Sequence, residues 1–119
     1  MALVKKIIKS NPREFIIKWT GSGSDTLLLS TLLGTSQTIS GVPSVNILDV
    51  LINQGASSNT KITRNNQDVL SITGSFQLQS TNTPHIVFDE NSGSDIIVNM
   101  GSDGTLILKV KKMAGYTGV

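Results

Sequence analysis

Apolar residues in this chain recur mainly at every second position. The longest examples are EFIIKWT at 14–20, where only Ile16 interrupts the alternation, and GTLILKVKK at 104–112. Side chains of a β-strand point alternately to its two faces, so this period predicts strands with one buried and one exposed face. Four shorter stretches repeat the pattern: DVLSIT, SFQLQ, HIVFDE and DIIVNM. VNILDVLIN, near residues 45–53, is apolar on both faces and predicts a central strand.

Clusters of Gly, Ser, Asn, Thr and Pro separate these stretches and predict turns. They are GSGSD at 21–25, GTSQTISGVPS at 34–44, NQGASSNT at 53–60, RNNQD at 64–68, STNTP at 80–84, ENSGS at 90–94 and GSDG at 101–104. Short strands at this spacing, without long helical patterns between them, predict an all-β fold. We expect a single antiparallel β-sandwich, jelly-roll-like, with roughly eight or more short strands.

Residues 25–34 permit two interpretations. Ser24 or Asp25 could cap a helix, the leucines that follow could form its apolar stripe, and Gly34 could end it. As a strand, the same segment would be apolar on both faces. We favour a strand, because every neighbouring stretch predicts β-structure.

The length of 119 residues suits one domain. We divide it into an N-terminal basic arm or edge strand (1–12), a β-sandwich domain (13–112) and a short C-terminal tail (113–119). The chain contains no cysteine, which excludes disulfides, thiolate zinc sites and cysteine nucleophiles. No apolar run is long enough for a targeting signal or a membrane span, so we expect a soluble protein and no membrane partner.

Charge is distributed unevenly along the chain. Residues 1–18 carry five basic side chains and one acidic one, and residues 104–119 carry three lysines and no acid. Residues 19–103 carry seven acids and two basic side chains. Basic ends can be solvated lysines that protect edge strands, or they can dock on an acidic neighbour. Nucleic-acid binding would need basic residues interleaved with aromatic ones, and that pattern is missing, so we predict no nucleic-acid partner.

Few residues suggest chemistry. The stretch FDENSGSD at 88–95 spaces Asp89, Asn91 and Asp95 like calcium ligands, but the bidentate Glu of an EF-hand loop is replaced by Met100. A hairpin turn at 91–94 explains it better. His85 is the only histidine and has no partner for catalysis or metal binding. We therefore predict no catalytic residue, no metal site, no cofactor and no enzyme activity.

The two ends of the chain are the best candidates for a contact surface. The arm could pair with the sheet edge of a neighbouring subunit, or it could be an ordinary first strand of its own sheet. The predicted partner contacts are Leu3, Lys5, Ile7 and Lys9 in the arm and Lys111, Lys112 and Tyr116 near the C-terminus.

Four stretches together carry a family resemblance: FIIKWTGSGSDTLLLSTL, VNILDVLINQG, TKITRNNQDVLSITGSF and SDIIVNMGSDGTLILKVKKMAGY. Their pattern resembles the small virion structural proteins of tailed bacteriophages, particularly marine ones, and among them the capsid decoration (cement) proteins. The resemblance implies a protein made in the host cytoplasm that binds the outer surface of the major capsid protein lattice and stabilises the shell. It also implies a homo-oligomer, a trimer by analogy.

Two alternatives remain open at this point. The same traits would suit a neck or tail protein of the virion. From a different class, a carbohydrate-binding β-sandwich module could attach to a host surface. That module would require Trp19 or Tyr116 to be exposed as a stacking platform.

Overall fold

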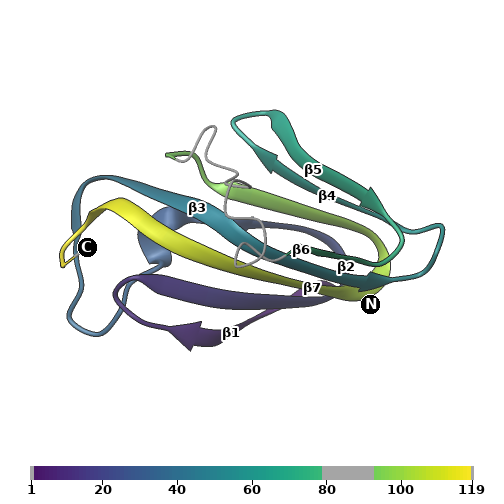
Figure 1. Ribbon diagram of the computed structural model, residues 1–119, viewed down its shortest axis with the longest axis horizontal. Coiled ribbons are helices and arrows are strands. Elements are labelled where there is room, and N and C mark those ends of the chain that lie inside the picture. Colours follow the sequence, from purple (N-terminus) through teal and green to yellow (C-terminus); the bar gives the residue numbers. More distant parts are fainter. Residues whose placement is uncertain (1, 79–92, 119) are drawn as a thin grey trace.

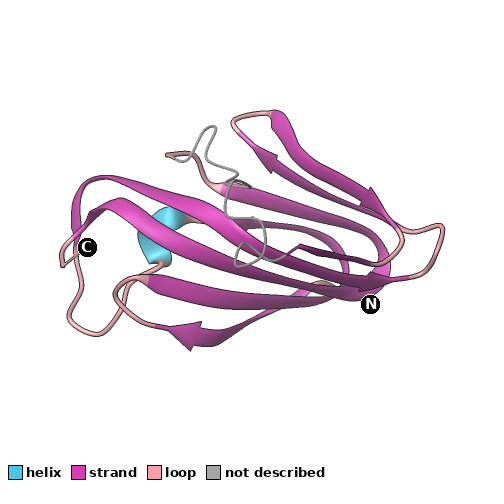
Figure 2. Ribbon diagram, in the orientation of Figure 1, coloured by secondary structure: helices cyan, strands magenta, loops and turns pink. Residues whose placement is uncertain are grey.

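The computed structural model describes residues 2–78 and 93–118 and shows an all-β protein (Figures 1 and 2). Seven strands and one short 3-10 helix lie in these residues. They are β1 (Val4–Ser10), β2 (Glu14–Leu27), η1 (Leu29–Thr31), β3 (Ile39–Gln54), β4 (Asn59–Arg64), β5 (Gln67–Thr73), β6 (Phe76–Leu78) and β7 (Ile96–Tyr116). All pairings between the strands are antiparallel. The predicted antiparallel, sandwich-like all-β fold is confirmed.

The long strands β2 and β7 each run through two layers of the fold. One layer has the order β1-β2-β7-β3-β6, while β4 pairs with β7 and with β5. Residues 96–100 of β7 pair with β4 and with the end of β2, and residues from 104 onward pair with β3 and with the start of β2. Both strands curve back at the same end of the molecule (Figure 1), so the sheet folds over itself, and its described strands do not close into a barrel.

GSGSD and GSDG, predicted as turns between strands, are instead bends within β2 and β7. The β2–β7 register shifts between Gly21 and Gly23, whose φ angles are 110° and 124°. Glycine adopts such angles without the steric cost that a side chain would bring. A Cβ on Gly104 would lie 2.9 Å from the backbone oxygen of Asn53, so the facing strand approaches too closely for a larger residue. Locally these glycines resemble turn residues, but the ladder continues through them.

Residues 25–34 contain part of each predicted alternative. β2 continues to Leu27, and a single 3-10 turn follows at Leu29–Thr31. The carboxylate of Asp25 does not cap a helix, because it accepts a 2.8 Å hydrogen bond from the indole of Trp19. The backbone N–H of Leu29 donates instead to Asp95, at 2.9 Å.

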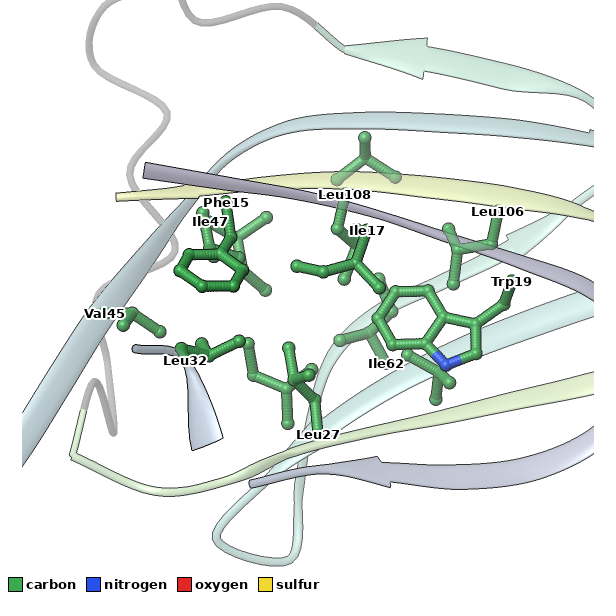
Figure 3. Close-up of a cluster of buried hydrophobic side chains, with 14 of the residues drawn as sticks. Phe15, Ile17, Trp19, Leu27, Leu32, Val45, Ile47, Ile62, Leu106 and Leu108 are labelled. Carbon is green, nitrogen blue, oxygen red and sulfur yellow. The ribbon is translucent and has the colours of Figure 1, made fainter. Parts of the chain in front are cut away.

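The core lies between the two layers and is built from the alternating apolar residues (Figure 3). Trp19 and Ile17 of β2 are fully buried, as are Leu106 and Leu108 of β7. Burying a side chain of this size stabilises the fold by about 1.5–3 kcal/mol. Because one face of β2 and β7 supplies these residues, the opposite face is left outside. The core comprises Phe15, Ile17, Trp19, Leu27, Leu29, Leu32, Val45, Ile47, Val50, Ile52, Ile62, Ile96, Val98, Met100, Leu106, Leu108, Val110 and Tyr116.

Candidate functional site

Strand β1 is the most exposed element of the fold. Within the described residues it pairs with β2 alone, at one end of the sheet order, so its other edge is open (Figure 1). All seven of its residues are exposed. Three of them are apolar: Val4 is 57% exposed, Ile7 41% and Ile8 50%. A β-bulge between Ile7 and Lys9 interrupts the pairing with β2. The strand therefore presents unpaired backbone groups and apolar side chains together.

The charge of this surface is positive. β1 carries Lys5, Lys6 and Lys9 and no acid, and Lys6 lies directly opposite Lys18 of β2. Like charges in directly opposed positions of a sheet destabilise it. The nearby acid Glu14 is already shared, with its carboxylate oxygens 3.9 Å from Lys9 Nζ and 3.4 Å from Lys109 Nζ. Among the described residues, the three lysines of β1 thus outnumber the acids that pair with them.

The predicted contact residues of the arm are placed together, but in the protein's own sheet. Lys5, Ile7 and Lys9 lie on β1 and are exposed, whereas Leu3 is partly buried against the core. Of the two interpretations of the arm, the structure shows the ordinary first strand, paired with β2. Within the predicted arm of residues 1–12, Val4–Ser10 thus form an edge strand whose outer side no other described strand pairs.

The predicted contact residues near the C-terminus are separated by their burial. Lys111 is exposed, but Lys112 is 1% exposed and Tyr116 only 4%. β7 extends to Tyr116, through most of the predicted tail 113–119. The prediction that Lys112 and Tyr116 contact a partner is wrong, because alternate residues of a central strand point into the core.

Lys112 is held in the core, and no carboxylate of residues 2–78 and 93–118 forms an ion pair with it. Its ammonium donates hydrogen bonds to the backbone oxygen of Asn11, at 3.2 Å, and to the side-chain oxygen of Gln37. It also lies 4.5 Å from the ring centre of Phe15 and 4.9 Å from that of Tyr116. Carbonyl dipoles and aromatic faces both attract a cation. Burial nevertheless lowers the pKa of Lys112 to about 8, because the charged form loses its hydration.

Tyr116 belongs to a buried polar cluster that includes Arg64, a residue absent from the predicted set. The Tyr116 hydroxyl donates to the backbone oxygen of Leu29 at 2.6 Å. Arg64 is fully buried and donates to the backbone oxygens of Val45, at 2.9 Å, and Ser94, at 2.8 and 3.1 Å. Burial raises the pKa of Tyr116 to about 12 and lowers that of Arg64 from its ordinary value. The position of Arg64, two residues after the core residue Ile62, was the available signal for an inward-facing arginine.

Metal and carbohydrate sites find no support in the part of the chain that the structure describes. There, no group of three or more His, Cys, Asp and Glu side chains could hold a metal ion. Three predictions fall wholly or partly outside the described residues. They concern Asp89 and Asn91 of the calcium hypothesis, His85, and the first two residues of the hairpin turn at 91–94. Trp19 and Tyr116 are buried, so neither can serve as a platform for a sugar ring. The carbohydrate-binding alternative is therefore wrong, because it required one of these two rings to be exposed. Residues 2–78 and 93–118 contain no helix that could span a membrane.

Comparison with known proteins gives a limited result. No family model matches the chain, and no curated protein matches it. Among solved structures, the chain is similar to KdgF from Halomonas sp., with 7% sequence identity and a TM-score of 0.47, over 94% of this chain and 82% of that one. Similarity at this level transfers no activity or ligand to the present chain.

The predicted function as a capsid decoration protein, or as another virion structural protein, is corrected. No family model or curated protein supports that function, and the similarity to KdgF, at a TM-score of 0.47, gives it no support either. The geometry also removes two predicted capsid contacts, since Lys112 and Tyr116 are buried. The open edge of β1 remains as the candidate functional site.

Proposed function

We propose that this protein is a non-catalytic interaction module that binds an acidic partner protein through strand β1. A single observation carries the proposal: a seven-residue edge strand, exposed along its whole length, combines three apolar side chains with three lysines. Apolar side chains at such a position gain free energy when a partner covers them. Three lysines that have only the shared carboxylate of Glu14 near them gain attraction from the acids of a partner.

The outward face of the adjacent strands extends the same surface. Lys18 and Ile16 of β2 lie opposite Lys6 and Lys9 of β1. Ile16 and Lys18 are only partly exposed, so they extend the surface of the β1 edge and do not form a separate patch. The positive charge therefore continues from the edge onto the sheet, which favours an acidic partner over a neutral one.

Affinity capture with matched charge variants tests the proposal. The purified protein is immobilised and exposed to an extract of its source organism, and the retained proteins are identified by mass spectrometry. The test variant is Lys5→Glu/Lys6→Glu/Lys9→Glu. The control, Arg13→Glu/Lys61→Glu/Lys111→Glu, makes the same change of net charge at exposed positions outside β1.

We expect the wild type and the control to retain the same acidic protein and the β1 variant to lose it by about tenfold or more. Raising the ionic strength should weaken retention, because salt screens exposed charges. Equal retention by the β1 variant and the control would contradict the proposal. Circular dichroism would establish that both variants remain folded.

A further inference from the structure

The open edge of β1 is suited to one kind of ligand, an extended polypeptide. Its seven residues present a row of backbone N–H and C=O groups that no other described strand pairs on that side. At about 3.3 Å per residue, the edge is about 23 Å long. A peptide that adds as a further strand satisfies these groups, and side-chain pockets along it then give specificity. A nucleic acid does not offer the regular row of both donors and acceptors that completes such a ladder. Of the described aromatic residues, Phe15, Trp19 and Tyr116 are too buried to stack on bases and Phe76 packs partly buried against the core.

The charges of β1 exclude a second copy of the same strand as the natural occupant. In an antiparallel pair centred on Ile7, Lys5 faces Lys9 of the other copy, and in one centred on Lys6 this residue faces itself. Every register brings six lysines and no acid onto one two-stranded ribbon. Lysines on an edge strand commonly prevent such self-pairing. The β1 edge is therefore protected against its own copies while it attracts acidic chains.

The other edge strands that the structure describes do not supply the missing acids. Strand β6 pairs only with β3, and its sequence FQL contains no acid. Strand β5 pairs only with β4, and its sequence QDVLSIT contains one acid, Asp68. Asp68 already lies 3.6 Å from Lys61 of its own sheet. A contact between β1 of one copy and β5 of another would thus leave the three β1 lysines without three acids. Among the edge strands that the structure describes, the complementary charges are therefore missing, which favours a different chain as their source.

Side-chain directions define what the ligand must offer. Val4, Lys6 and Lys9 lie opposite outward-facing residues of β2, and Lys5 and Ile7 lie opposite the inward-facing Trp19 and Ile17. Each face of β1 therefore carries both an apolar side chain and a lysine. A matching strand needs acidic and apolar residues on both of its faces, rather than a strict alternation of the two.

Resting on the proposed function of β1, we infer that the partner binds as an added antiparallel strand: an extended segment of a different protein, with acidic residues opposite the β1 lysines and apolar residues opposite Val4, Ile7 and Ile8. The antiparallel direction follows the other pairings of the sheet and gives the slightly more stable ladder.

Peptide binding tests this inference. The probe is the acetylated and amidated peptide TEVVEEV, which places acids opposite Lys9, Lys6 and Lys5 and valines opposite the apolar positions. One control, TKVVKKV, reverses the charges. The other, TEVPEEV, keeps the acids but replaces one central residue by proline, which removes a backbone donor and disfavours a paired strand. Amide NMR shifts and hydrogen exchange report the site, and fluorescence anisotropy reports the affinity.

We expect TEVVEEV to protect β1 amides from exchange and to bind about tenfold or more tightly than either control. Equal binding of TEVVEEV and TEVPEEV would overturn strand addition, since attraction by charge alone would then suffice. Absence of binding at millimolar peptide would overturn it as well. So would β1 amides that are already protected in a dimer of the free protein. Each of these results would overturn strand addition alone. The proposed function is tested separately by affinity capture, and it fails if the Lys5→Glu/Lys6→Glu/Lys9→Glu variant retains the partner as well as the control does.

Discussion

The chain contains two pairs of consecutive lysines, Lys5–Lys6 and Lys111–Lys112, and the two pairs differ in burial. Both members of the first pair are exposed, because β1 lies at the end of the sheet and covers nothing. In the second pair only Lys111 is exposed, and Lys112 is buried, because β7 is a central strand bordered by β2, β3 and β4. The position of the strand in the sheet, rather than the residue type, thus decides what a lysine does.

The difference also separates stability from binding. Lys112 links Asn11 before β2, Gln37 before β3 and the rings of Phe15 and Tyr116, so it ties together segments that are distant in sequence. Gln37 strengthens the same junction by donating to the backbone oxygens of Pro12 and Thr117, both at 2.8 Å. The lysines of β1 hold no comparable junction. Removing them should leave the fold intact and affect only the surface.

The largest effect is expected from Lys112→Ala. The substitution leaves a cavity beside two aromatic rings and removes a donor from one buried and one part-buried oxygen, so the free energy of unfolding should fall by about 3 kcal/mol. The matched control is Lys111→Ala, one residue away and exposed, which should change it by about 0.5 kcal/mol or less. Urea denaturation measures both. Equal losses would show that burial does not distinguish the two lysines.

The next effect should follow from neutralising Lys112 while its stem stays in place. Its pKa is about 8 in the folded protein against an ordinary 10.5, so the unfolded chain binds more protons between these values and stability rises with pH across that window. Tyr116 has the opposite effect, because its pKa of about 12 exceeds the ordinary 10.0 and stability falls between those values. Thermal unfolding should therefore show greatest stability near pH 10.

Two substitutions assign the limbs of this pH profile. Lys112→Met removes the titrating amine but keeps an apolar stem of similar length, so the rise between pH 8 and 10.5 should disappear. Tyr116→Phe removes the falling limb, since this is the only tyrosine in the chain. A Lys112→Met protein whose profile runs parallel to that of the wild type would show that another group causes the rise.

The sequence predicted what depends on local alternation and missed what depends on neighbours in space. The inward face of β2, with Phe15, Ile17 and Trp19, follows from the period of two and is buried as expected. Sequence alone predicts turns at Gly21 and Gly104, because a turn and a bend inside a continuous ladder require the same residues. Lys112 was assigned to the surface, although its position two residues after Val110 placed it on the buried face. Only the central place of β7 makes that face inaccessible.

The smallest predicted effect concerns the opposed pair Lys6 and Lys18. Lys6→Thr removes a like-charge contact between adjacent strands and should raise the free energy of unfolding by about 0.5 kcal/mol at low salt. Lys5→Thr is the matched control, because it loses the same charge and gains the same β-propensity but lies opposite Trp19. High salt should erase the difference between the two variants, since screening removes the repulsion in the wild type. If Lys6→Thr were no more stable than Lys5→Thr, the two lysines would not repel each other measurably. If it is more stable and yet binds the peptide TEVVEEV more weakly, then Lys6 acts against the fold and in favour of the partner, whereas Lys112 acts for the fold alone.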